Sequence, residues 1–196
     1  MKKLTIALLA AVLAACTSTA KFQHTTQKEL NALIQTASFA MPEVVLPSFP
    51  DRTFSVLDYG ADPTGANLST NAFQQAIDAC NAAGGGTVII PAGVYTTAGI
   101  TLKSNVRLYT EQNAFITFSP DVALYPIYAT WFEGVPTMRS QSPISAFNAE
   151  NIAITGQGIF NGNGDYWRPL KRNKMSDVQW KEHIKKGGVL SADGKV

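Results

Sequence analysis

The stretch over residues 71–118 constrains the fold most, because it places one amphipathic helix directly before a series of very short strands. Apolar residues at positions 73, 76, 77 and 80 recur at helical spacing, so the predicted helix at 71–83 has one apolar face. Asn71 and Gln74 approximate a capping box at its start, and a triple glycine ends it.

Short apolar runs rich in β-branched and aromatic residues follow this helix. Only a few Gly, Pro, Asn or Ser residues separate one run from the next, which is typical of strands punctuated by turns. The runs cover residues 87–90, 94–97, 100–102, 106–109 and 114–118. The pattern predicts one helix that leads into a ladder of small strands.

Composition supports a folded domain and gives no sign of a nucleic-acid partner. The chain is 45% hydrophobic and only 15% charged, enough to bury a core in one domain. Its net charge of +2 comes from 16 basic and 14 acidic residues, and Lys2 and Lys3 belong to a segment that we expect to be removed. The mature chain is then neutral, and we expect no nucleic-acid binding.

The first residues have the pattern of an export signal. Lys2 and Lys3 form a positive region, residues 4–13 an apolar region too short to span a bilayer, and residues 13–16 resemble a bacterial lipobox. This pattern predicts a signal peptide at 1–15 and lipidation of Cys16, which would anchor the chain to a membrane. Thr17 after this cysteine favours the outer membrane of a Gram-negative cell by resemblance to such lipoproteins. The alternative is an ordinary signal peptide and a periplasmic or extracellular protein.

The remaining cysteine and the histidines predict no metal site. Cys80 falls on the apolar face of the predicted helix and is expected to be buried and unpaired. His24 and His183 are the only histidines, and neither has ligand spacing. We therefore expect no metal and no cofactor.

Residues 16–51 are predicted to be a tether, and residues 52–196 the folded domain. Residues 29–34 have the composition for one or two helical turns, whereas three prolines between 41 and 50 exclude a regular helix there. The alternating run at 53–57 marks the start of the domain, and the turn-forming residues at 58–65 follow it.

Three segments, in this order and spacing, resemble the start of pectate-lyase-like right-handed parallel β-helix proteins. They are Phe54-Ser-Val-Leu-Asp-Tyr-Gly-Ala-Asp-Pro-Thr-Gly65, the helix that begins Phe73-Gln-Gln-Ala-Ile77, and Gly84-Gly-Gly-Thr-Val-Ile-Ile-Pro-Ala-Gly-Val-Tyr95. Over residues 53–170 the continuation is similar to the polygalacturonases of glycoside hydrolase family 28. The resemblance implies an all-β, right-handed parallel β-helix with an N-terminal capping helix.

The physics of such a stack agrees with the pattern. Each coil buries only what the next coil covers, so an end is an exposed apolar disc, and the helix at 71–83 would cap it and block edge pairing. A repeated motif supports the coils: Ser104-Asn105-Val106-Arg107-Leu108 recurs as Glu150-Asn151-Ile152-Ala153-Ile154. A β-sandwich is the alternative, because it also contains short strands.

The segment at 119–143 interrupts the coils and is expected to be a long loop. It holds Tyr125, Tyr128, Trp131 and Phe132 among three prolines. Aromatic rings on such a loop either stack on sugar rings or pack the loop against the coils, and the sequence leaves both interpretations open.

A glycine-rich segment and a basic tail complete the chain. Residues 151–169 resemble the segment that closes an early coil in family 28, and they lack the context of a phosphate cradle or a calcium repeat. Ser176 and Gln179 predict a capped helix that ends at Gly187 and Gly188. From residue 165 onward the chain has eight basic and four acidic residues. This basic excess predicts either a solvated helix surface or a surface that attracts a polyanion.

The resemblance implies hydrolysis of α-1,4-galacturonosyl links in pectin with inversion, by carboxylates that protonate the leaving oxygen and activate a water. The Asn-x-Asp, Asp-Asp, Gly-His-Gly and Arg-x-Lys segments that carry this chemistry in the family do not occur here. We therefore assign no catalytic residue, since Asp165 alone cannot perform paired-carboxylate chemistry. The expected protein is an inactive, monomeric N-terminal fragment, truncated after the first coils, of an enzyme that binds pectic polysaccharide.

Two other functions stay open. A non-catalytic, lipid-anchored carbohydrate-binding or structural module would have the same cap and coils. A lyase would need calcium and a basic catalyst, and neither is indicated by these residues.

Overall fold

A computed structural model describes residues 26–168, 170–186 and 194. The predicted signal peptide and the lipidation site Cys16 lie outside these residues. No helix within the described part of the chain has the length and apolar character needed to cross a bilayer.

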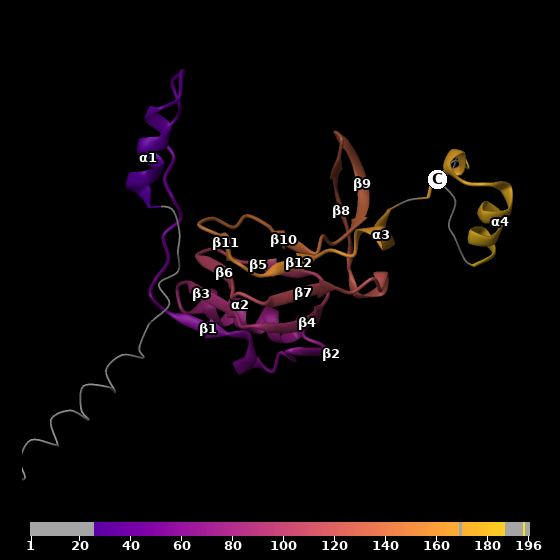
Figure 1. The fold of residues 1–196 in the computed structure, drawn as a ribbon, viewed down its shortest axis with the longest axis horizontal. Coiled ribbons are helices and arrows are strands. Elements are labelled where there is room, and N and C mark those ends of the chain that lie inside the picture. Colours follow the sequence, from indigo (N-terminus) through magenta and orange to yellow (C-terminus); the bar gives the residue numbers. More distant parts are fainter. Residues whose placement is uncertain (1–25, 169, 187–193, 195–196) are drawn as a thin grey trace, which may run out of the picture.

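The core is a stack of coils whose strands form parallel sheets (Figure 1). One sheet has the order β1-β3-β6-β11, a second β12-β7-β4-β2, and a third pairs β10 with β5. The strands are β1 (Thr53–Ser55), β2 (Thr64–Leu68), β3 (Gly86–Ile90), β4 (Gly93–Thr97), β5 (Ile100–Leu102), β6 (Val106–Thr110), β7 (Ala114–Phe118), β10 (Ile144–Ala146), β11 (Ala153–Gly156) and β12 (Ile159–Asn161). All pairs in these sheets are parallel. The structure therefore confirms the parallel β-helix and excludes the β-sandwich.

The strands of successive coils pair in a register that places equivalent residues above one another. Val88 on β3 lies opposite Leu108 on β6, which lies opposite Ile154 on β11. In β6 and β7 every second side chain is buried, as expected where one face of a strand points into the coil. Inward-pointing residues of successive coils thus form continuous apolar columns.

Helix α2 (Thr70–Ala82) seals the start of the stack. Its buried residues include the predicted apolar positions Phe73, Ala76, Ile77 and Cys80, and all of them belong to the core. The Phe73 ring meets Tyr95 edge to face, with centroids 5.7 Å apart. The predicted capping role of this helix is therefore confirmed, as is the burial of Cys80, which forms no disulfide with a described residue. Burial raises the pKa of the Cys80 thiol to about 11.

The polar side of α2 takes the place of a neighbouring strand. The Thr70 hydroxyl accepts a hydrogen bond from the backbone N–H of Ala98 at 2.7 Å. The Gln74 amide accepts from the N–H of Thr101 at 2.9 Å and donates to its carbonyl at 3.1 Å. The coil edge beside α2 is therefore paired by side chains, which blocks addition of a further strand there.

The predicted capping box of α2 is wrong. The N-cap is Ser69, and it makes no side-chain capping bond. The Gln74 amide is used by Thr101 on β5 instead, because pairing the edge of a buried coil satisfies two backbone groups at once.

The repeated Asn motif forms a corner of the stack. Asn105 and Asn151 both adopt positive φ, at 64° and 54°, a conformation that Asn tolerates better than most residues. The Asn151 amide donates to the Asn105 side-chain oxygen at 2.9 Å. The two motifs therefore stand one above the other, as their similarity predicted.

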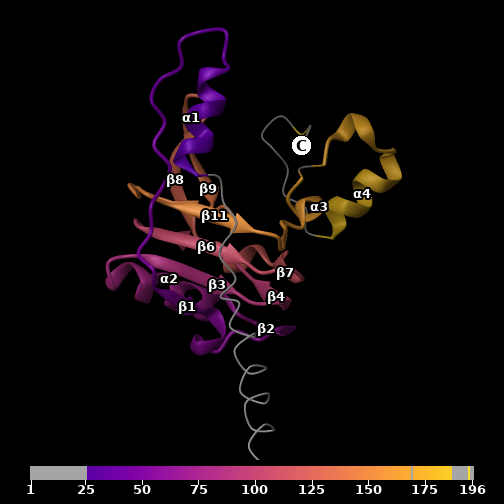
Figure 2. The same cartoon turned by 60° about the vertical axis from the view of Figure 1, so that its left-hand side comes forward.

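The interruption at 119–143 leaves the coil, as predicted, but most of it is an antiparallel hairpin. After the 3-10 turn η2 (Val122–Leu124), β8 (Ile127–Phe132) pairs with β9 (Val135–Ser140). Glu133 and Gly134 both have positive φ, so they make the two-residue turn that favours a tight hairpin. Figures 1 and 2 show this hairpin projecting beyond β11 and β12.

Residues before the first coil also contact the stack. Helix α1 (Gln27–Gln35) begins at a Thr26–Glu29 capping box, near the predicted helical turns. Further on, the Ser48 N–H donates to the Asn151 side chain at 2.9 Å, and the Ser48 carbonyl accepts from it at 2.7 Å. The end of the predicted tether is thus fixed against a corner of the coils.

The chain continues through short helices. α3 (Gly164–Trp167) and η3 (Arg172–Lys174) precede α4 (Asp177–Lys185), and η1 (Val56–Tyr59) follows β1 near the start of the stack. The predicted Ser176–Gln179 capping box is present at α4. Its predicted end at Gly187 and Gly188 lies outside the described residues. Figure 2 shows α4 standing apart from the coils.

Candidate functional site

A groove lies where the base of the β8–β9 hairpin meets the outer side of the β5–β10 sheet. It has a volume of about 410 Å³ and is lined by Thr101, Pro126, Tyr128, Gln141 and Phe147. Thr101 is the outward residue of β5, between the buried Ile100 and Leu102. The rigid coil therefore supplies the floor, and the hairpin and the residue after β10 supply the walls.

Polar groups on the floor are tied together. The Gln141 amide nitrogen donates to the hydroxyls of Thr101 at 3.1 Å and Ser145 at 3.2 Å. These two hydroxyls are 3.2 Å apart, because Ser145 on β10 is the register partner of Thr101. The network fixes the Gln141 amide and leaves its oxygen without a donor among the described residues.

Two aromatic rings form a wall of the groove. Tyr128 and Phe147 meet edge to face, with centroids 5.5 Å apart and ring planes at 82°. Such pairs add rigidity to a site and present flat apolar surface to a ligand. Aromatic surface beside a fixed amide and hydroxyls suits a ligand with one apolar face and many hydroxyl groups, such as a sugar.

Arg139 extends the site along the hairpin. It is the direct cross-strand partner of Tyr128. Its guanidinium carbon lies 4.1 Å from the centroid of the Phe132 ring. In the part of the chain that the structure describes, Arg139 forms no salt bridge.

The four aromatic residues singled out in the segment at 119–143 do not share one role: one packs against the coils, and the other three lie at the groove or on the hairpin. Tyr125 packs the segment onto the coils: it is buried, its hydroxyl donates to the Ser119 carbonyl at 2.8 Å, and its ring meets Trp167 edge to face. Burial raises the pKa of Tyr125. Tyr128 lines the groove, Phe132 lies under Arg139, and Trp131 is exposed.

Acidic residues of the coils have structural roles. Asp62 accepts hydrogen bonds from the backbone and side chain of both Thr64 and Asn67. These bonds, with those from Thr64 foremost, lower the pKa of Asp62 from 3.8 to about 2. Burial acts to raise the pKa of Asp78, but the hydrogen bonds from Lys103 and Gln74 outweigh it and lower the value. Among the described residues no group of three or more His, Cys, Asp or Glu side chains is placed to hold a metal ion.

The glycine-rich segment closes a coil. β11 and β12 pair with β6 and β7, and a Cβ atom on Gly156 would lie 2.0 Å from the Thr110 carbonyl oxygen. The glycine is required by the close approach of the neighbouring coil. Asp165 lies on α3 and does not line the groove.

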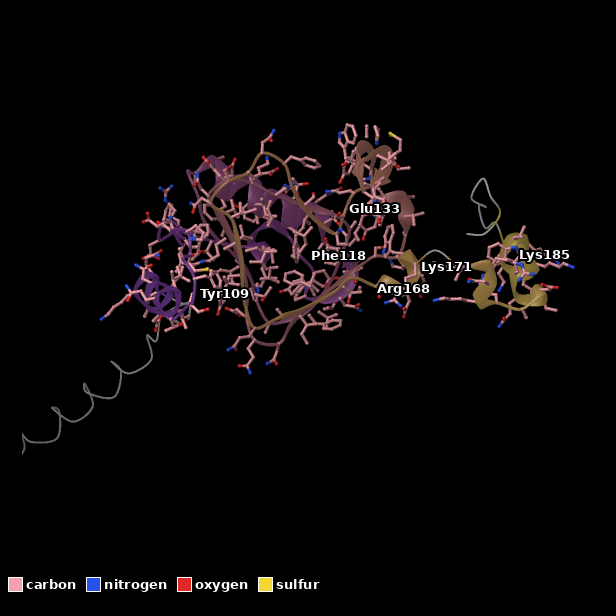
Figure 3. All side chains as sticks on the ribbon, turned by 90° about the horizontal axis from the view of Figure 1, so that it is seen from above. Tyr109, Phe118, Glu133, Arg168, Lys171 and Lys185 are labelled. Atoms are coloured by element: carbon pink, nitrogen blue, oxygen red, sulfur yellow. The ribbon has the colours of Figure 1, made fainter. Side chains whose placement is uncertain are left out.

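The basic tail leads away from the coils. Figure 3 shows Arg168, Lys171 and Lys185 along a path from Phe118 in the stack towards α4. Arg172 pairs with Asp177 within the tail. The described residues of the tail, 168 and 170–186, thus form a separate basic surface, and none of them lines the groove.

Sequence reasoning missed the polar floor and Phe147. Alternation along residues 100–102 places Thr101 outward, but its pairing with Ser145 depends on which strand stacks on β5. The β8–β9 hairpin separates β5 from β10 in the sequence, so the sequence alone does not show which residues of the two strands pair.

Comparisons with known proteins agree with the fold. Residues 53–121 match the family model described as Rhamnogalacturonase A/epimerase, pectate lyase-like. An exo-poly-alpha-D-galacturonosidase of Dickeya chrysanthemi is 33% identical over 148 residues, which are 71% of this chain and 23% of that protein. The hyperthermoactive exopolygalacturonase of Thermotoga maritima superposes with a TM-score of 0.61 at 30% identity, over 84% of this chain and 39% of that one.

A second solved structure carries the family designation. The family 28 exopolygalacturonase of Yersinia enterocolitica has a TM-score of 0.52 and 34% identity, over 58% of this chain and 21% of that one. The chain thus spans between a fifth and two fifths of the length of these three relatives. It is a right-handed parallel β-helix of the pectate-lyase-like type, homologous to the exopolygalacturonases of glycoside hydrolase family 28.

Proposed function

We propose that this chain forms the cap and early coils of an exported glycosidase that hydrolyses α-1,4-galacturonosyl links in pectin. The observation that carries the proposal is the 33% identity over 148 residues to an exo-poly-alpha-D-galacturonosidase. The groove beside the hairpin supports it, because it combines aromatic rings with fixed polar groups on a rigid coil.

On this proposal, the described coils bind and position the polysaccharide, and other segments perform the chemistry. Inverting hydrolysis needs two carboxyl groups about 6.5–9.5 Å apart around the scissile bond. No acid lines the groove. The hairpin projects beyond β11 and β12, so its groove would lie beside any coil stacked on them (Figure 1).

The activity test uses polygalacturonate and a reducing-end assay. We expect the purified chain to release no reducing ends, whereas a longer product with Asn-x-Asp, Asp-Asp and Gly-His-Gly segments releases them. Hydrolysis by the chain alone would show that the carboxylates are already among its residues.

A lipid-anchored binding module is the second candidate. It is favoured by the groove and by Trp131, which is 70% exposed on the hairpin. Genomic DNA beyond codon 196 separates the two: an in-frame or frameshifted continuation with the catalytic segments supports the enzyme, and a stop without such remnants supports the module.

Export and anchoring are part of the proposal. The lipobox-like residues before Cys16 predict an acylated, membrane-bound protein, and Cys16→Ser is expected to abolish labelling by radioactive palmitate. Labelling that persists in this variant would exclude Cys16 as the acylated residue. The basic tail at 168–186 would attract polygalacturonate at low salt.

A further inference from the structure

We propose that Arg139, Tyr128 and Phe147 form an accessory site for one uronic acid residue with a free carboxylate, outside the coils that perform hydrolysis. The sugar ring lies against the two aromatic side chains, and the guanidinium of Arg139 holds the carboxylate. The inference rests on the proposed function and narrows it to a residue-level site that distinguishes the free acid from its methyl ester.

The orientation of Arg139 suits a carboxylate. Its guanidinium lies over the Phe132 ring, 4.1 Å from the centroid, so one face is covered. Stacking leaves the N–H groups at the edge of the guanidinium available, and these groups pair with both oxygens of a carboxylate at once. Phe132 therefore pre-orients the cation.

The position of Arg139 brings this cation to the groove. Arg139 and Tyr128 are directly opposite in the hairpin and share one face of it. Such partners have Cβ atoms about 4.5–5.5 Å apart. Tyr128 lines the groove and Arg139 does not, so the guanidinium over Phe132 lies beside the groove, on the same face of the hairpin as Tyr128.

The groove has room and hydrogen-bonding groups for one sugar ring. Its volume of about 410 Å³ is within the range of roughly 300–1,000 Å³ found for small-molecule sites. The fixed oxygen of Gln141 is available to accept a bond from a sugar hydroxyl.

Charge makes the site selective. The lining of the groove has no charged residue, and no acidic side chain of the described ranges forms a salt bridge with Arg139. A uronate supplies the missing negative charge. A methyl-esterified or neutral sugar does not, so its binding would lack the charge-assisted hydrogen bonds.

The test measures binding of galacturonic acid trimer to the full chain by isothermal titration calorimetry. Arg139→Gln is expected to weaken binding about ten- to a hundredfold, the effect of losing charge-assisted hydrogen bonds. Arg139→Lys keeps the positive charge but loses the planar guanidinium that pairs with both carboxylate oxygens. Its affinity is expected to lie between those of the wild type and Arg139→Gln. Lys28→Gln, which changes an exposed basic residue on α1 outside both the groove and the basic tail, is the matched control and should bind like the wild type.

Two further measurements make the result decisive. The fully methyl-esterified trimer should bind the wild type about as weakly as the acid binds Arg139→Gln. Equal thermal midpoints for the variants show that the fold is unchanged.

The outcomes separate the two proposals. The inference is overturned if the acid binds Arg139→Gln as it binds the wild type, or if the ester binds the wild type as tightly as the acid. The proposed function still stands in that case, provided that the wild type binds polygalacturonate. A wild-type chain that binds no galacturonate polymer contradicts the proposed function itself.

Discussion

The coils and the β8–β9 hairpin are both built from apolar strands, but they treat their apolar side chains in opposite ways. In the coils, Val106, Leu108 and Ile116 are 0% exposed. On the hairpin, Trp131 is 70% exposed and Met138 is 63% exposed. Since burial supplies most of the stability of a domain, the coils stabilise the fold and the hairpin is available for binding.

The largest difference in the free energy of unfolding is expected between the variants Phe73→Ala and Trp131→Ala. Phe73 is a fully buried residue of α2, so its truncation should lower the free energy of unfolding by about 3–5 kcal/mol. Trp131 is exposed, and its truncation should change that free energy by less than about 0.5 kcal/mol. Urea unfolding followed by circular dichroism measures both, and equal losses would contradict the division between coil and hairpin.

Two glycines with positive φ give the next comparison. In Gly156→Ala the new methyl group would meet the Thr110 backbone on the neighbouring coil, whereas no atom lies within 4 Å of the same position on Gly134. Overpacking at Gly156 should cost about 1–3 kcal/mol beyond the strain of a positive φ that both variants share. A thermal midpoint lowered as much by Gly134→Ala as by Gly156→Ala would show that the coils are not closely stacked there.

A smaller effect is expected at the corner formed by Asn151. Asn151→Ala removes the hydrogen bonds to Asn105 and to Ser48, each worth about 0.5–1.5 kcal/mol. Asn148→Ala is the matched control, because Asn148 also has positive φ and makes none of these bonds. Faster proteolysis before the first coil in Asn151→Ala, but not in the control, would confirm that Ser48 is held by this corner.

The smallest expected effect is the contribution of Asp62 to stability at low pH. The folded-state pKa of Asp62 is about 2, below its ordinary 3.8, so its hydrogen bonds stabilise the fold above pH 3.8 and are lost as the pH falls towards 2. The wild type should lose stability over this range, and Asp62→Asn should lose less. Parallel curves of unfolding midpoint against pH would mean that Asp62 does not contribute.

The sequence predicted the coils well because their physics is local and periodic. The apolar positions of α2 recur at helical spacing, and this spacing predicts one buried helix face. The repeated Asn105 and Asn151 motifs predict equivalent corners of successive coils, and the two side chains are hydrogen-bonded to each other. The groove was only partly predictable. Tyr128 was among the candidate aromatic residues, but Gln141 and Phe147 reach the groove through a coil register that the hairpin conceals.

Affinity electrophoresis in gels that contain polygalacturonate tests the central claim most directly, which is that the hairpin groove on these coils holds the polysaccharide. The account predicts that the wild-type chain is retarded relative to a plain gel, and that Tyr128→Leu, with an unchanged thermal midpoint, migrates almost as it does without polymer. A wild-type chain that is not retarded, or a variant that is retarded equally, would contradict it.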